Sequence, residues 1–253
     1  MVRLTVMWFT VVIFLLGIPG DPCAQIIGGK KSVPHSRPFM AKIKDSKGGL
    51  CGGTLIKSNW VLTAAHCKIT NDTEVILGIH SEEDKTKQVF KVKKNISHPK
   101  YNNVTKENDI MLLQLNREAQ LNKNVSFVEL PWVYSDLEPG TQCLVAGWGI
   151  TERPSPSDVL REVNVSVIAR TICNDQKHYN STPIVTKNMV CAGDERGGKD
   201  ACTGDSGGPL MCKGEQRGIV SFGKECGEAQ YPGVYTLLTN EYSLWINSVI
   251  KGN

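Results

Sequence analysis

The sequence predicts an all-β fold that is closed by one C-terminal helix. Short runs of alternating apolar and polar residues recur along the chain, for example over residues 89–92, 163–167 and 234–237. Gly, Pro, Asn or Ser bounds each run, which is typical of half-buried strands. Near the end of the chain, apolar residues recur at helical spacing after Asn240, a residue type that favours helix N-caps. They are Tyr242, Trp245, Ile246, Val249 and Ile250.

This pattern of strands suits β-barrels or sandwiches, and by itself it does not indicate a function. The 253 residues are enough for one large domain or two small ones. From Ile26 onward no linker, repeat or low-complexity tract interrupts the composition, and residues 154–157 (Pro-Ser-Pro-Ser) predict an exposed loop. With 40% hydrophobic and 21% charged residues, the composition is that of a soluble globular protein.

Residues 1–25 predict a cleaved signal peptide. Arg3 gives a short positive start, residues 4–18 form an apolar run, and residues 19–21 (Pro-Gly-Asp) end it. A membrane-spanning helix needs about 20 apolar residues, so this run is too short to span. We therefore expect a secreted protein without a membrane span. The alternative is a membrane-anchored N-terminus.

Cysteines and glycosylation sequons are both typical of an oxidising, secretory destination. Of the nine cysteines, Cys23 lies beside the apolar run, and its removal with a signal peptide would leave eight. Eight cysteines can form four disulfides in 105 different pairings. Acceptor asparagines in N-x-S/T triplets are Asn71, Asn95, Asn103, Asn124, Asn164 and Asn180.

The net charge of +4 includes one local basic stretch. One interpretation is a solvated strand face, and the other is adhesion to an acidic polymer such as a sulfated proteoglycan. Because no nucleic-acid-binding motif accompanies the charge, we expect no nucleic-acid partner. The stretch consists of Lys85, Lys87, Lys91, Lys93 and Lys94.

Three short stretches carry residues suited to nucleophilic catalysis. Residues 63–67 read T-A-A-H-C, Asp109 opens an apolar run, and residues 204–209 read G-D-S-G-G-P. A serine hydroxyl needs a neighbouring base to become a nucleophile, and a carboxylate can orient that base. A lone histidine or aspartate is more often structural. Together, His66, Asp109 and Ser206 predict a catalytic triad.

These motifs resemble those of the chymotrypsin-like (S1) serine peptidases, and the resemblance runs from Ile26 to the C-terminus. It implies two antiparallel six-stranded β-barrels with a C-terminal helix, in one peptidase domain over residues 26–253. It also implies that His66 takes the Ser206 proton and that Asp109 orients the imidazole. The backbone N–H groups of Gly204 and Ser206 would stabilise the oxyanion.

The resemblance extends to an activation device. Residues 26–29 (Ile-Ile-Gly-Gly) resemble the mature N-terminus of such peptidases. Cleavage after Gln25 would free an ammonium on Ile26, which could pair with Asp205 and order the active turn. We therefore expect an inactive precursor. The alternative for Asp205 is a simple turn-forming role.

Substrate preference is predicted from the positions that match the family's specificity pocket. Asp200 lies six residues before Ser206, where trypsin-like members carry the carboxylate that receives a basic side chain. Gly223 and Gly233 match the glycines that leave room for it. Ala201 stands where many relatives have serine, so we expect Arg to be preferred to Lys, because a guanidinium meets a carboxylate bidentately.

The resemblance also implies contacts with the substrate backbone and a disulfide pairing. Ser221, Phe222 and Gly223 would pair with the substrate as an added strand, with Phe222 at a position where many relatives have tryptophan. The implied disulfides are Cys51–Cys67, Cys143–Cys212, Cys173–Cys191 and Cys202–Cys226.

Within the family, several segments resemble lymphocyte granule peptidases of the granzyme A and granzyme K type: residues 34–40, 160–163, 188–193 and 233–238. This likeness implies a signal peptide over residues 1–23 and an activation dipeptide over 24–25. It also implies granule storage, and protein protease inhibitors as partners. Relatives of the granzyme A type dimerise through an extra cysteine in the region of Lys100. This sequence has no cysteine there, so we expect a monomer. Ala201 departs from the serine of both types.

No cofactor or metal is expected. Glu82, Glu83 and Asp84 could suggest a calcium loop, but Ile79 stands where a ligand carboxylate is expected, so we interpret them as a solvated acidic turn. The other histidines lack metal-ligand spacing and are expected at the surface. They are His35, His80, His98 and His178.

Two rival functions remain open. The first is a catalytically weak binding or antimicrobial protein on the same scaffold, since a fold does not guarantee an activity. Such relatives usually lack a triad member, whereas all three are present here. The second rival is a digestive or plasma trypsin-like protease. The short pro-segment argues weakly against it.

Overall fold

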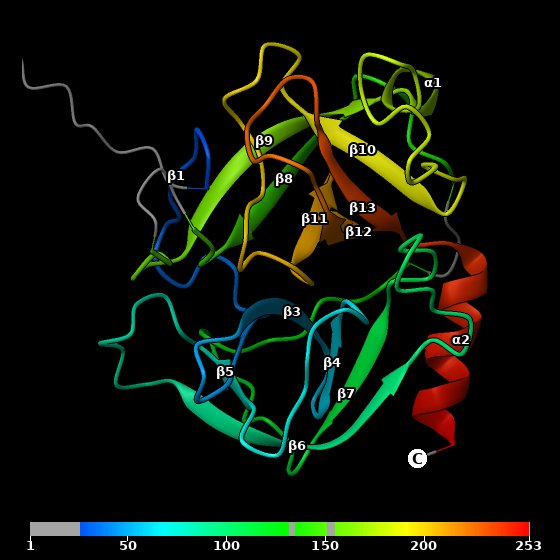
Figure 1. Ribbon diagram of the computed structural model, residues 1–253. Coiled ribbons are helices and arrows are strands. Elements are labelled where there is room, and N and C mark those ends of the chain that lie inside the picture. Colours follow the sequence, from blue (N-terminus) through cyan, green and yellow to red (C-terminus); the bar gives the residue numbers. More distant parts are fainter. Residues whose placement is uncertain (1–25, 132–134, 151–154, 253) are drawn as a thin grey trace, which may run out of the picture.

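The computed structural model describes residues 26–131, 135–150 and 155–252. Its strands form two antiparallel six-stranded barrels that lie one above the other in Figure 1. The predicted fold class is therefore confirmed. The expected signal peptide (1–23) and activation dipeptide (24–25) lie outside the described residues.

The first barrel is closed because its first strand pairs with both a neighbour in sequence and a distant strand. In spatial order its strands are β2 (Met40–Lys44), β3 (Leu50–Lys57), β4 (Trp60–Thr63), β7 (Met111–Leu115), β6 (Gln88–Ser97) and β5 (Glu74–Leu77).

The second barrel closes through the pairing of its first two strands. An additional short strand, β1 (Lys30–Lys31), pairs with the outer edge of β9. The order in the barrel is β8 (Gln142–Gly147), β9 (Arg161–Ile168), β10 (Met189–Gly193), β13 (Gly233–Leu237), β12 (Glu215–Phe222) and β11 (Pro209–Cys212).

The three runs of alternating residues that predict strands lie within β6, β9 and β13. In β9 the alternation has a direct structural cause. Val163, Val165 and Val167 are buried in the core of the second barrel, whereas Asn164 between them is exposed. Side chains of a strand alternate between its two faces, so one face fills the barrel and the other meets solvent.

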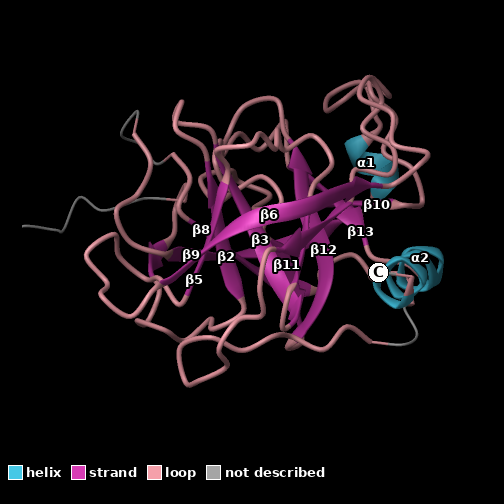
Figure 2. Ribbon diagram, turned by 90° about the horizontal axis from the view of Figure 1, so that it is seen from below, coloured by secondary structure: helices cyan, strands magenta, loops and turns pink. Residues whose placement is uncertain are grey.

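Two helices lie on the same side of the strands (Figure 2): α1 (Arg170–Cys173) and α2 (Asn240–Lys251). The predicted C-terminal helix is α2, but its N-cap is Thr239 rather than Asn240. The Thr239 hydroxyl accepts a hydrogen bond from the Tyr242 N–H, and Asn240 is already helical. None of the helices in the described residues is long and apolar enough to cross a membrane.

Each end of the described chain packs against the barrel that is formed by the other half of the sequence. Ile26 and strand β1 belong to the second barrel, although they precede the first barrel in sequence. Helix α2 follows the second barrel but buries Tyr242 and Ile246 in the core of the first, beside which it descends in Figure 1. Each barrel therefore depends on a segment from the other end of the chain.

One histidine expected at the surface is buried. His98, which directly follows β6, is only 5% exposed, because its ring packs edge-on against Tyr242 and Trp245 of α2. This burial lowers the pKa of His98 below its ordinary value. The ring therefore belongs to the contact between α2 and the first barrel.

Candidate active site

His66 and Asp109 meet at one edge of the first barrel. Strands β4 and β7 are paired, with Thr63 opposite Met111, so the residues that follow β4 lie beside those that precede β7. The His66 Nδ1 atom lies 2.7 Å from Oδ2 of Asp109, and the His66 backbone N–H donates to Oδ1 at 2.9 Å. The carboxylate thus fixes both the ring and the backbone of the histidine.

The Asp109 carboxylate is completely buried and is bound from both barrels. Ser221 on β12 donates its hydroxyl proton to Oδ2 at 2.5 Å, and the Thr236 hydroxyl on β13 donates to the Asp109 carbonyl oxygen at 2.9 Å. A buried charge is costly unless hydrogen bonds satisfy it. These contacts therefore hold the carboxylate and also connect the two barrels.

Ser206 comes from the second barrel, in the turn that precedes β11. Its carbonyl oxygen accepts from the Gly52 N–H of β3 at 2.7 Å, and Gly207 donates to Val220 at 2.8 Å. Ser206 and His66 line the same hollow of about 260 Å³. Within the described residues no hydrogen bond joins their side chains; in unliganded sites such bonds are often long and tighten on substrate binding.

The turn before Ser206 requires glycine. Gly204 has φ +97°, and a Cβ there would lie 2.9 Å from the Gly149 Cα. In the part of the chain that the structure describes, neither the Gly204 nor the Ser206 backbone N–H has an acceptor. Both donors are free to bind a negative oxygen that develops beside Ser206.

Comparison with known proteins identifies the family. The family model described as Trypsin matches residues 26–246. Granzyme A of Bos taurus is 49% identical, with 96% of each chain covered. Mast cell protease 3 of Ovis aries is 41% identical over 95% of this chain and 96% of its own, and trypsin of Xenopus laevis is 39% identical over 98% and 100%.

The chain belongs to the trypsin family. It is a serine endopeptidase, and the resemblance seen in the sequence motifs is confirmed. Its similarity to granzyme A of Bos taurus covers 96% of the chain. His66, Asp109 and Ser206 are the residue types of a Ser-His-Asp triad: the first two are hydrogen-bonded, and Ser206 lines the same hollow as His66.

Ser206 also lines a second hollow of this protease. Its volume is about 290 Å³, and Asp200 lies at its buried end with only 3% of its surface exposed. Oδ2 of Asp200 accepts from the Gly227 N–H at 3.1 Å, while Oδ1 has no partner among the described residues. Burial raises the pKa of this carboxyl to about 7.

The walls of this hollow explain several of the predicted pocket residues. A Cβ at Gly233 would lie 2.7 Å from Oδ1 of Asp200, so a side chain there would block the carboxylate, whereas one at Gly223 would meet nothing within 4 Å. Ala201 and Phe222 also line the hollow. Tyr235 lines it too, and its buried hydroxyl has no partner in the described chain.

The segment that begins at Ile26 packs against the pocket of this protease. The Ile26 side chain is buried in the second barrel, and the Asp200 N–H donates to the Ile27 carbonyl at 3.2 Å. Asp205 is fully buried, and its carboxylate accepts from the N–H groups of Gly149 at 2.7 Å and Cys202 at 2.9 Å. Burial raises the pKa of Asp205 to about 6, and no cation contacts it among the described residues.

Sequence reasoning missed Gly147 and Gly149. A Cβ on Gly147 would lie 2.0 Å from the Asp205 Oδ1 atom, and one on Gly149 would lie 2.6 Å from its carboxyl carbon. The only signal is the run Ala-Gly-Trp-Gly over residues 146–149. Its glycines bracket Trp148, whose ring is buried between the two barrels.

The structure contains four disulfides, in the pairing that the family resemblance implies. Cys51–Cys67 borders the hollow that contains His66, and Cys202–Cys226 borders the hollow that contains Asp200. Both restrain loops that carry site residues. The remaining two bonds are Cys143–Cys212 and Cys173–Cys191.

Among the described residues no group of three or more His, Cys, Asp or Glu side chains is arranged to hold a metal ion. Glu82 of the acidic turn binds the Lys42 ammonium at 2.5 Å, and Asp84 accepts from the backbone N–H groups of His80 and Ser81. Five acceptor asparagines are exposed and Asn124 is partly buried; the exposed ones are Asn71, Asn95, Asn103, Asn164 and Asn180.

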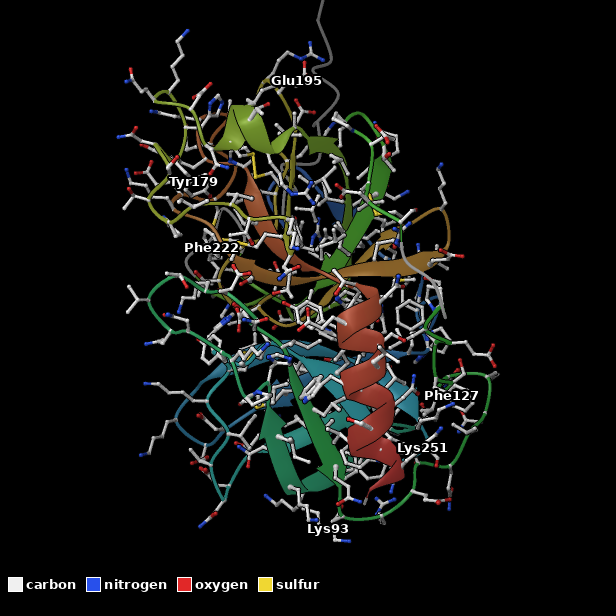
Figure 3. All side chains as sticks on the ribbon, turned by 90° about the vertical axis from the view of Figure 1, so that its right-hand side faces the viewer. Lys93, Phe127, Tyr179, Glu195, Phe222 and Lys251 are labelled. Carbon is white, nitrogen blue, oxygen red and sulfur yellow. A yellow bond between two sulfur atoms is a disulfide. The ribbon has the colours of Figure 1, made fainter. Side chains whose placement is uncertain are left out.

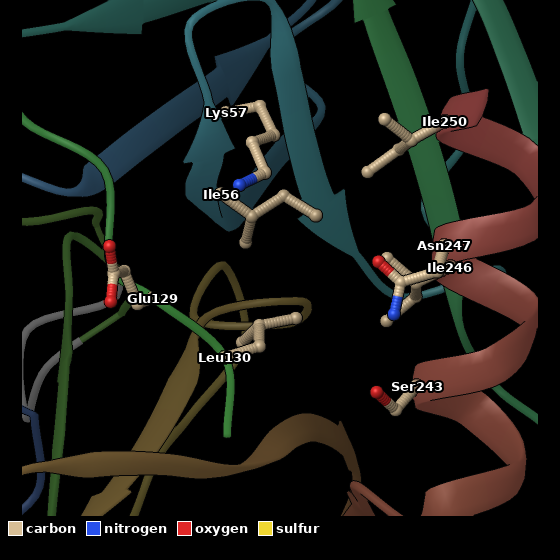
Figure 4. A pocket seen from close by; sticks show the side chains of 8 residues that line it. All are labelled: Ile56, Lys57, Glu129, Leu130, Ser243, Ile246, Asn247 and Ile250. Atoms are coloured by element: carbon tan, nitrogen blue, oxygen red, sulfur yellow. The ribbon is translucent and has the colours of Figure 1, made fainter. Parts of the chain in front are cut away.

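A further cavity of about 240 Å³ lies between strand β3 and helix α2 (Figure 4). Ile56 and Leu130 line one side, and Ile246 and Ile250 of α2 line the other. None of the predicted site residues borders it. The two hollows that share Ser206 therefore form the candidate active site.

Proposed function

We propose that this serine endopeptidase is a secreted, trypsin-like enzyme that cleaves after Arg, and less efficiently after Lys. The supporting observation is the buried Asp200 carboxylate, whose Oδ1 atom has no protein partner in the described chain and lies in the hollow beside Ser206. A buried carboxylate is stabilised strongly by a cation. Ala201 offers no hydroxyl to an ammonium, which favours the bidentate guanidinium.

The proposed mechanism has two chemical steps. His66 removes the Ser206 proton as the serine oxygen attacks the scissile carbonyl, and then gives the proton to the leaving amine. Asp109 holds the imidazole and stabilises its charged form, while the free N–H groups of Gly204 and Ser206 bind the oxyanion. Water then cleaves the acyl-enzyme with the same histidine as base.

Activation completes the proposal. Removal of a signal peptide (1–23) and then of a dipeptide (24–25) would expose an ammonium on Ile26. Pairing with Asp205 would lower the pKa of this carboxyl, which is raised to about 6 because burial outweighs the hydrogen bonds from Cys202 and Gly149. Because the Gly149 and Cys202 N–H groups already bind Asp205, the ion pair would stabilise the turn that carries Gly204.

Granule storage, an acidic proteoglycan partner and protein protease inhibitors belong to the same proposal, as does a monomeric state. The sulfated polymer would bind the basic stretch at residues 85–94. In that stretch Lys91 contacts Glu74 at 3.2 Å and Lys87 contacts Glu82 at 3.8 Å, so Lys93 is the more available cation. Similarity to granzyme A and to mast cell protease 3 supports the granule assignment.

The deciding experiment uses protein that begins at Ile26, with Ser206→Ala as the matched control. Both are assayed on peptides that differ only in Arg, Lys, Phe or Asp before the cleaved bond. We expect cleavage after Arg, weaker cleavage after Lys, and none by Ser206→Ala. Cleavage after Phe or Asp alone would contradict the pocket assignment, and no cleavage at all would favour the binding-protein rival.

Activation is tested separately with protein that begins at Ala24. Its activity on the Arg peptide should be at least about 100-fold lower until the dipeptide is removed. Equal activity before and after removal would overturn the activation proposal and leave the specificity proposal intact.

A further inference from the structure

The pocket beside Ser206 has a charged group at each of two depths. Asp200 and Lys224 are the only charged side chains among the described residues that line it. Asp200 is buried at its inner end, whereas Lys224 is exposed where β12 leaves the barrel. Lys224 is therefore the charged lining residue that lies toward solvent.

The Lys224 ammonium is held in position by an aromatic group rather than by a carboxylate. Its Nζ atom donates to the Tyr231 hydroxyl at 2.8 Å and lies 4.2 Å from the centre of the Tyr231 ring. Tyr231 packs edge-on against Tyr179, which in turn packs edge-on against Phe222. Within the described chain no carboxylate oxygen lies within 4 Å of Nζ, although Glu225 is adjacent in sequence.

A polypeptide bound along the pocket wall would bring one particular side chain to this ammonium. Ser221 contacts Asp109 and so lies next to the reacting bond, and Lys224 is three residues farther along the same wall, about 10 Å away in an extended chain. In an extended substrate, side chains two apart face the same way. The residue two before the basic one therefore faces the pocket rim, where Gly223 leaves open space.

We propose that Lys224 makes the protease prefer an acidic side chain two residues before the basic residue that enters the pocket. This inference rests on the proposed cleavage after Arg. A glutamate at that position would meet an ammonium that has no carboxylate oxygen within 4 Å among the described residues, and a lysine there would be repelled by it. Exposed ion pairs are weak, so the expected preference is at most about fivefold in kcat/KM.

The test compares three peptides with Arg before the cleaved bond and Glu, Gln or Lys two residues earlier. Protein that begins at Ile26 should cleave them in the order Glu, Gln, Lys. Lys224→Gln should cleave all three at similar rates, Lys224→Glu should reverse the order, and Lys224→Arg should keep it. Because each ratio is measured within one variant, a general loss of folded enzyme cancels.

Two controls separate this preference from general electrostatics. Lys93→Gln removes an exposed ammonium of the first barrel, far from Phe222 in Figure 3, and should leave the ratios unchanged. Moving the glutamate to the position directly before Arg turns it to the opposite face of the substrate and should weaken the effect. Raising the ionic strength from about 0.1 to about 1 M, which shortens the screening length from about 10 to about 3 Å, should reduce the preference.

The outcomes distinguish this inference from the function on which it rests. If no Arg peptide is cleaved, the proposed function itself fails. If Arg peptides are cleaved but the Glu, Gln and Lys peptides react equally, the role of Lys224 is refuted and the specificity for Arg stands. An unchanged preference in Lys224→Gln would likewise assign the selectivity to another group.

Discussion

Among individual residues, Asp200 combines deep burial with an incomplete set of hydrogen bonds. Its pKa is raised from 3.8 to about 7, chiefly because burial disfavours the charged form. The unfolded chain would lose this proton near pH 4, whereas the folded protein keeps it until about pH 7. The contribution of Asp200 to stability is therefore complete below about pH 4 and is lost progressively as the pH rises to about 7.

This gives opposite predictions for stability and activity in Asp200→Asn. Without substrate, the variant should be more stable than the wild type at pH 8, by up to about 4 kcal/mol, and nearly equal to it at pH 4. Its cleavage of Arg peptides should fall by at least about 100-fold. Denaturant unfolding at both pH values measures the first effect. The control Asp158→Asn, at an exposed carboxylate, should change neither stability nor cleavage. If Asp200→Asn were less stable than the wild type at pH 8, the predicted cost of burying this charge would be refuted.

The sequence predicts His66 and Ser206 through short, specific motifs and Asp109 as the start of an apolar run. The structure joins His66 to Asp109 and places Ser206 on the same hollow as His66. The contacts between distant segments around the site could not be predicted. Asp205 is bound by Gly149, which comes from more than fifty residues earlier, and Tyr179 contacts both Phe222 at the end of β12 and Tyr231 in a later loop. Such contacts depend on how the strands pair, and local sequence carries no record of that pairing.

At the level of secondary structure, helix α2 shows what spacing can and cannot predict. Apolar spacing predicts its existence and its buried face, because Tyr242 and Ile246 are buried as the helical repeat requires. The cap is wrong by one residue, because Thr239 and Asn240 are both suitable types and the end of β13 decides which remains extended. The burial of His98 under this helix was not predictable from its own neighbours in sequence.

The packing of α2 can be tested with two substitutions on the same helix. Ile246→Ala should lower the free energy of unfolding by about 2–5 kcal/mol, because it leaves a cavity where Ile246 meets the first barrel. Leu244→Ala is the matched control, since Leu244 is 73% exposed, and it should change stability by less than about 0.5 kcal/mol. Equal effects in chemical denaturation would show that α2 does not pack as described.

For the molecule as a whole, the cysteine pairing predicts whether two copies can be linked by a disulfide bond. The eight cysteines of the described chain are all paired within it, so none is available for a bond to a second copy. Protein that begins at Ile26 should therefore form no disulfide-linked dimer. Light scattering during gel filtration and a non-reducing gel measure this directly, and a disulfide-linked dimer would contradict the pairing.

The exchange of chain ends between the barrels also bears on biosynthesis. The strands of the first barrel leave the ribosome long before α2 has been translated, so Tyr242 and Ile246 are not yet present to fill its core. In the same period Ile26 and β1 have no second barrel to join. The core of the first barrel is therefore completed only after α2 has been translated, and until then the nascent chain exposes the apolar surface that α2 covers.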